Sequence, residues 1–115
     1  MENIIYTELR RRGFNVDVGI VEKRKTDKNG KKYYTQLEVD FVANKGSDKY
    51  YIQSAYSIED NSKREQELQS LLNISDNFKK MVIVYDSFIK WQDQSGIIYI
   101  SIYDFLLNEN SLKEA

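Results

Sequence analysis

The chain has 115 residues, 41% of them hydrophobic and 30% charged, which is the composition of one globular domain (residues 1–115) and not of a disordered segment. Cysteine and histidine are absent, so disulfides, thiolate metal sites and a histidine base are excluded, and any catalysis would have to use carboxylates, lysines, tyrosines or hydroxyl groups. The net charge is −1, so binding to nucleic acid would require a local basic patch.

The first half of the chain has the pattern of one helix followed by three strands. Ile5 and Leu9 recur at helical spacing within residues 2–12, and Gly13 ends this helix. Strands are expected at 15–25, 33–44 and 49–56, joined by two-residue turns at Asn29-Gly30 and Gly46-Ser47. The three strands would form an antiparallel meander.

The second half predicts a helix over 60–73, a buried strand over 81–85, another strand over 97–102 and a closing helix over 103–108. The first of these helices would be capped by Asp60 or Asn61 and have an apolar stripe of Leu68, Leu71 and Leu72. The order α-β-β-β-α-β-β-α, with a helical crossover, predicts an α/β fold whose mixed sheet has helices on both faces. No apolar run approaches the roughly 20 residues that span a bilayer, and no signal-peptide pattern is present, so we expect a cytoplasmic protein without membrane contact.

Counting residues across the two turns places an acid beside an amide on the sheet. The register pairs Phe41 with Ile52 and Asp40 with Gln53, and it places Gly19 opposite Asp40. One face would then be apolar and consist of Val18, Ile20, Val39, Phe41 and Ile52. The other face would carry Glu38, Asp40, Tyr51, Gln53 and Ala55.

Glu8 lies at the apolar edge of the first helix, where an unpaired carboxylate is costly. It could converge with Asp40 and Gln53, and three oxygen-bearing side chains would suit a hard divalent cation such as Mg²⁺. Other arrangements explain the same residues, since Glu8 could form a salt bridge with an arginine and Gln53 could hydrogen-bond to Asp40 or to a backbone group.

Two basic segments are candidates for contact with nucleic acid. One ends the first helix, and the other is the hairpin over 23–32, which carries six basic residues against Glu22 and Asp27. The expected contacts are Arg10, Arg11, Arg12, Lys23, Arg24, Lys25, Lys31 and Lys32. The alternative is that both segments are solvated surface charge.

Several segments, spread over nearly the whole chain, resemble one known family. They are 2–14, 37–43, 51–56, 63–68, 72–80 and 102–106. In content and order they are similar to the DUF4143-type domain at the C-terminus of a group of prokaryotic AAA-type ATPases, which is assigned to the PD-(D/E)XK nuclease superfamily. The resemblance implies a restriction-endonuclease-like core, and an AAA-type ATPase module in the same or a partner chain.

In active members of that superfamily a helix glutamate, a strand aspartate and a Glu-x-Lys on the next strand bind Mg²⁺ and activate water. By this resemblance Glu8 and Asp40 match the first two acids and would be the metal ligands, whereas Gln53 replaces the second strand acid and Ala55 replaces the lysine. An amide binds a divalent ion less well than a carboxylate, and alanine cannot activate water. The resemblance therefore implies a degenerate site that needs no cofactor, with Mg²⁺ or Mn²⁺ expected only if Lys49 or Lys63 substitutes for the lysine and the site is active.

Three functions are consistent with the sequence. The first is a non-catalytic binding or regulatory module of an AAA-type ATPase that contacts nucleic acid or protein. The alternatives are a divalent-metal-dependent phosphodiesterase with an altered active site, and an interaction or dimerisation scaffold that uses the nine tyrosines. No Gly-x-x-x-x-Gly-Lys-Ser/Thr loop is present, so nucleotide binding by that route is not expected. The sequence leaves open whether the chain is part of a longer protein, and its oligomeric state.

Overall fold

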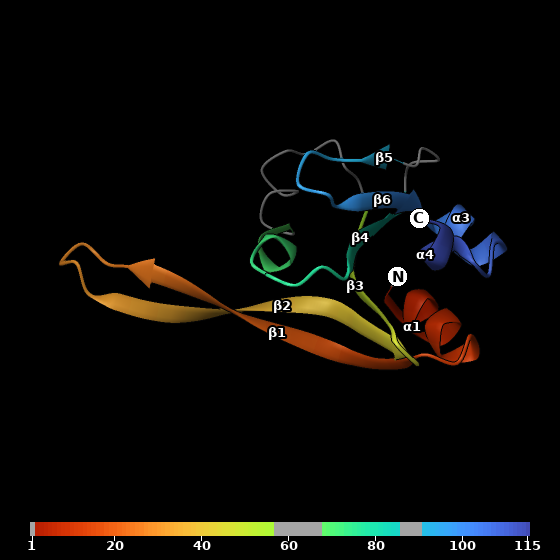
Figure 1. Ribbon diagram of the computed structural model, residues 1–115, viewed down its shortest axis with the longest axis horizontal. Coiled ribbons are helices and arrows are strands. Elements are labelled where there is room, and N and C mark those ends of the chain that lie inside the picture. The colour runs from red at the N-terminus through yellow and green to blue at the C-terminus, as the bar shows by residue number, and fades with distance from the viewer. Residues whose placement is uncertain (1, 57–67, 86–90) are drawn as a thin grey trace.

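A mixed β-sheet with helices on both faces forms the body of the protein (Figure 1). The computed structural model describes residues 2–56, 68–85 and 91–115, and within them the sheet has six strands in the order β1-β2-β3-β4-β6-β5. The strands are β1 (Asn15–Thr26), β2 (Lys32–Lys45), β3 (Asp48–Ala55), β4 (Lys79–Val84), β5 (Trp91–Gln92) and β6 (Ile98–Ser101). The helices are α1 (Glu2–Arg11), α3 (Ile102–Leu107) and α4 (Ser111–Glu114), and residues 68–72 are also helical. The α/β class is confirmed.

The strand pairing follows the predicted topology. Strands β1, β2 and β3 form the expected antiparallel meander, whereas β3 pairs with β4, and β4 with β6, in parallel. A parallel pair needs a crossover connection, and the helical residues 68–72 lie on the crossover between β3 and β4. Strand β5, antiparallel to β6, and helix α4 were not predicted. The predicted caps Asp60 and Asn61 lie outside the described residues.

Two hydrophobic clusters, one on each face of the sheet, hold these elements together. On the first face α1, α3 and α4 bury Ile5, Leu9, Phe41, Ile52, Met81, Ile83, Ile100, Phe105 and Leu112, among others. On the second face the helical residues 68–72 contribute Leu68 and Leu71 to the other cluster. The sheet contributes Val39, Tyr51, Ala55, Val82, Val84 and Tyr99. Strand β4 contributes alternate residues to both clusters, as expected for a strand buried on both faces. Leu72, predicted in the apolar stripe, is instead 47% exposed.

The two hairpins differ in how well their register was predicted. Phe41 pairs with Ile52 across the Gly46-Ser47 turn as expected, and Gly46 has the positive φ of +60° that such a turn requires. At the other hairpin the prediction of a two-residue turn was wrong, because residues 27–31 form a longer loop. The carboxylate of Asp27 closes this loop by accepting hydrogen bonds from the backbone N–H groups of Asn29 (2.9 Å) and Lys31 (2.8 Å).

A β-bulge changes the faces of β2. The β1–β2 register shifts between Asp17 and Gly19, so that Asp40 and Phe41 of β2 both lie opposite Val18. Gly19 therefore pairs with Val39 and not with Asp40.

Because of the bulge, the residues predicted to form one apolar face do not share a face. Val39 packs in the cluster around residues 68–72, whereas Phe41 packs against α1 on the opposite side of the sheet. Val18 and Ile20, predicted on the same apolar face, are 64% and 62% exposed.

The described part of the chain contains no helix that is long and apolar enough to cross a membrane.

Candidate functional site

Asp40 and Gln53 lie beside each other on β2 and β3, as the register predicts. The side-chain carbonyl of Gln53 accepts a hydrogen bond from the backbone N–H of Asp40 (2.6 Å), and its amide donates to Ser70 Oγ (2.8 Å) and to the carbonyl of Glu38 (3.3 Å). Gln53 is only 6% exposed. The amide therefore ties the two strands to the helical residues 68–72, which is the structural arrangement that the sequence left open.

The other side chains at the predicted catalytic position also have structural roles. One carboxylate oxygen of Asp40 accepts from both the N–H (2.9 Å) and the hydroxyl (3.1 Å) of Ser54. Ala55, at the position that the family resemblance assigns to lysine, is buried in the apolar cluster with Val39 and Tyr51. This position is therefore a packing site in the present chain.

The carboxylate of Glu8 forms hydrogen bonds with two arginines at the C-terminal end of α1. Its carboxylate accepts from Arg11 Nε (3.0 Å) and Nη2 (2.7 Å), and from Arg12 Nε (2.9 Å). These hydrogen bonds, that of Arg11 first, lower the pKa of Glu8 from 4.5 to about 2. The described residues contain no group of three histidine, cysteine or acidic side chains placed to share a metal ion. Glu8 and Asp40 thus have separate partners, and the geometry does not support the expected convergence on a metal.

Arg12 is a buried structural residue, so it is removed from the predicted nucleic-acid contacts. Its side chain is 4% exposed, and its guanidinium donates to the carbonyl of Phe105 and to Ser111 Oγ (3.3 Å) while lying 4.6 Å above the Phe105 ring. Arg11 remains on the surface but also pairs with Glu109 (2.9 Å). The arginine segment thus mainly fastens α1 to the C-terminal helices.

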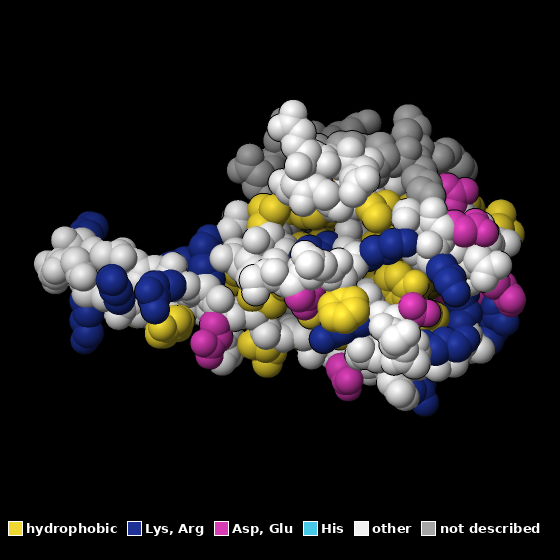
Figure 2. All heavy atoms as spheres, viewed as in Figure 1, with side chains coloured by type: hydrophobic (Ala, Val, Ile, Leu, Met, Phe, Trp, Pro, Cys, Tyr) yellow, Lys and Arg dark blue, Asp and Glu magenta, His cyan; other side chains and the backbone are white. Residues whose placement is uncertain are grey.

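The hairpin of β1 and β2 projects from the body as a two-stranded arm (Figure 1). Dark blue basic side chains follow this arm to its tip, far from the rest of the molecule (Figure 2). Lys23 Nζ, near the base of the arm, donates to Gln69 Oε1 (2.6 Å). Beyond it, Arg24 donates to the hydroxyl of Tyr34 (3.1 Å) and lies 5.7 Å above its ring.

Four further lysines of the arm are exposed and have no acidic partner within salt-bridge distance among the described residues; they are Lys25, Lys28, Lys31 and Lys32. The nearby acid Asp27 is occupied by the loop N–H groups. Sequence reasoning missed Tyr33 and Tyr34, which are 43% and 60% exposed on the same arm. Exposed aromatic rings among basic residues are a recognisable signal of a nucleic-acid surface.

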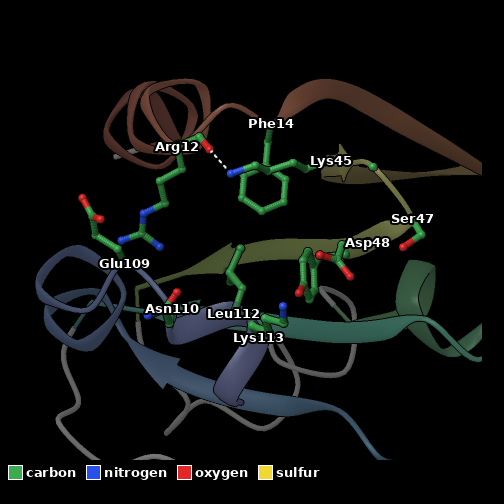
Figure 3. A pocket seen from close by; sticks show the side chains of 11 residues that line it. Arg12, Phe14, Lys45, Ser47, Asp48, Glu109, Asn110, Leu112 and Lys113 are labelled. Atoms are coloured by element: carbon green, nitrogen blue, oxygen red, sulfur yellow. Dashed lines mark hydrogen bonds between the residues drawn. The ribbon is translucent and has the colours of Figure 1, made fainter.

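A cavity of about 400 Å³ lies at the opposite end of β2, between the β2–β3 turn, the start of β1 and α4 (Figure 3). Lys45 crosses it and donates to the carbonyl of Arg12 (2.7 Å), while its ammonium lies 5.7 Å from the centre of the Phe14 ring. Asp48 and Lys113 also line the cavity. With charges of both signs on its wall and its central lysine already bound, the cavity does not define one class of ligand.

No family model matches the chain. An uncharacterized protein of Haemophilus influenzae is 35% identical over 107 residues, which cover 93% of this chain and 22% of that protein. The chain therefore spans about a fifth of the length of this relative. Fold and site together define a mixed α/β domain with a projecting basic hairpin.

Proposed function

We propose that the chain is a non-catalytic, nuclease-like module that binds nucleic acid through the β1–β2 hairpin. The observation that carries this proposal is the concentration, on an arm that projects from the body, of cations that have no acidic partner among the described residues. The chain as a whole has a net charge of −1, yet six basic residues lie in this one segment. Such a local excess attracts the phosphate backbone and releases its counterions.

The chemistry of the Asp40 corner supports the non-catalytic part of this proposal. Hydrolysis by a PD-(D/E)XK site requires a second strand carboxylate and a lysine, and the resemblance assigns these positions to Gln53 and Ala55. Gln53 uses its amide to connect secondary-structure elements, and Ala55 is buried among apolar side chains. The proposal is therefore a binding domain of the DUF4143 type whose restriction-endonuclease-like core no longer cleaves.

We further propose that the domain works in the cytoplasm with an AAA-type ATPase module, in the same or a partner chain. The relative from Haemophilus influenzae supports a role within a larger protein, because the match covers only 22% of its length. Coupling to an ATPase rests on the family resemblance alone.

The test combines binding and cleavage in one titration. We expect the purified chain to bind a short labelled nucleic acid and to leave it intact with Mg²⁺ or Mn²⁺ present, whereas Lys25→Gln/Lys31→Gln should bind roughly tenfold more weakly or worse. Lys49→Gln/Lys113→Gln, which removes two charges from the body, is the matched control and should bind like the wild type. Circular dichroism would verify that each variant folds.

Two results would overturn the proposal. Metal-dependent cleavage that disappears in Asp40→Ala would show a working nuclease. Equal binding by the hairpin variant and the wild type, or no binding by either, would show that the hairpin is not a nucleic-acid contact. Concentration-dependent self-association that is lost in the hairpin variant would indicate the scaffold function in its place.

A further inference from the structure

We infer that the hairpin enters the major groove of duplex DNA as a two-stranded ribbon, with one phosphate backbone on each side of it. This inference rests on the proposed function and specifies its substrate class. It is carried by the length of the free arm, its width and the distribution of its cations over two faces.

The arm is long enough to reach the floor of the groove. Lys23, bonded to Gln69, is the outermost arm residue with a hydrogen bond to the body among the described residues. At about 3.3 Å per residue, the strand continues for about 10 Å from Lys23 to Thr26, before the loop over 27–31 begins. The major groove of B-form DNA is about 8.5 Å deep.

The width of the arm selects the form of the duplex. Two paired strands lie about 4.8 Å apart, and with their side chains they form a ribbon that the roughly 12 Å wide major groove of B-form DNA admits. The major groove of A-form RNA is deep and too narrow for side chains to read. The width of a two-stranded arm therefore favours duplex DNA over duplex RNA.

The register distributes the cations over both faces of the ribbon. Residues paired across an antiparallel ladder project to the same side of the sheet. Arg24 pairs with Tyr34, and Lys32 pairs with Thr26 two positions further along, so both cations lie on one face. Lys25 pairs with Tyr33, which places this lysine on the other face. A ribbon lying flat on nucleic acid needs cations on one face only, whereas a ribbon between two backbones needs them on both.

The tip of the arm would then meet the edges of the bases. Lys28 and Asn29 lie in the loop that Asp27 closes. Lysine donates to the acceptors of guanine, and asparagine makes paired hydrogen bonds with adenine. Lys28 and Asn29 are therefore the residues through which the arm would distinguish sequences.

The test compares three labelled probes of equal length: duplex DNA, single-stranded DNA and duplex RNA. We expect duplex DNA to bind roughly tenfold or more tightly than either of the others, at one fixed salt concentration. Arg24→Gln and Lys25→Gln, one on each face, should each weaken duplex binding severalfold, and Lys113→Gln should not. Netropsin, which fills the minor groove, should not displace the protein.

The outcomes separate this inference from the proposed function. Equal or tighter binding of single-stranded DNA or duplex RNA would overturn the groove inference and leave the hairpin as a nucleic-acid contact. An effect of only one face variant, or displacement by netropsin, would do the same. Failure to bind any of the three probes would overturn both proposals.

Discussion

Arg12 fastens the N-terminal helix to the C-terminal helices through one guanidinium group. It pairs with Glu8 on α1, donates to the carbonyl of Phe105 on α3 and to Ser111 Oγ on α4, and covers the Phe105 ring. A buried cation with a full set of partners is costly to truncate, because its partners lose their hydrogen bonds without gaining water.

Truncation of Arg12 should therefore be among the most destabilising single changes to a charged residue. We expect Arg12→Ala to lower the free energy of unfolding by about 3 kcal/mol in urea titrations. The neighbouring Arg10, which is exposed and within the described residues donates only to the carbonyl of Phe14 at 3.4 Å, is the matched control. Arg10→Ala should change stability by about 0.5 kcal/mol or less. Similar losses for both variants would contradict the structural role of Arg12.

Glu8 should give the protein a defined dependence of stability on pH. The arginines, Arg11 first, lower the pKa of Glu8 from 4.5 to about 2 in the folded state. A group with a depressed folded-state pKa stabilises the fold above its unfolded value, and this contribution is lost as the pH falls through the folded value. The difference in unfolding free energy between the wild type and Glu8→Gln should thus be constant above pH 4.5 and shrink from pH 4.5 to about 2. A difference independent of pH would refute the assignment.

The β-bulge at Asp40 and Phe41 decides which side chains of β2 face each hydrophobic cluster. Gly19 lies next to this bulge, and a Cβ atom there would be 2.6 Å from Cγ2 of Val42 and 3.2 Å from Cβ of Val39. Val39 is fully buried, so it has little room to move.

We therefore expect Gly19→Ala to destabilise the protein by about 1–3 kcal/mol through overpacking. Val18 is the neighbouring residue and is exposed, and threonine keeps its β-branched shape. Val18→Thr should therefore change stability by about 0.5 kcal/mol or less. Chemical denaturation of the two variants would measure the contrast. Equal stability of Gly19→Ala and the wild type would mean that β1 and β2 do not approach each other as closely as described.

Strand β2 pairs with β3, but not with β1, in the register that the sequence predicts. The β2–β3 register was predictable because the Gly46-Ser47 turn is short and no residue is inserted after it, so Asp40 and Gln53 were placed correctly. The β1–β2 register was not predictable from the sequence. Alternating apolar residues do not reveal a bulge, in which two residues of one strand lie opposite one residue of its neighbour.

The candidate site was predictable to a similar extent. The position of Glu8 on α1 was clear, but its partner depends on how α3 and α4 pack around Arg12, which spacing within α1 cannot show. The basic hairpin was found from composition, whereas the division of its charges between two faces needed the observed register.

The protein as a whole divides into a packed body and a basic arm. Since the net charge is −1 and the arm carries an excess of cations, the remainder of the chain is net negative. The separation of charge would orient the arm towards a polyanion during approach. The arm extends along the long axis of the molecule, which measures 51 Å, so its basic tip lies at one end of the protein.

The dependence of duplex affinity on salt concentration tests most directly whether the hairpin binds nucleic acid. The slope of log K against log salt concentration is negative, and its magnitude falls by about 0.9 for each phosphate contact that is removed. Lys31→Gln/Lys32→Gln should therefore reduce the slope by about 2 relative to the wild type, and Lys49→Gln/Lys113→Gln should leave it unchanged. Identical slopes for the wild type and the hairpin variant, or a reduction confined to the body variant, would contradict the claim that the hairpin binds the nucleic acid.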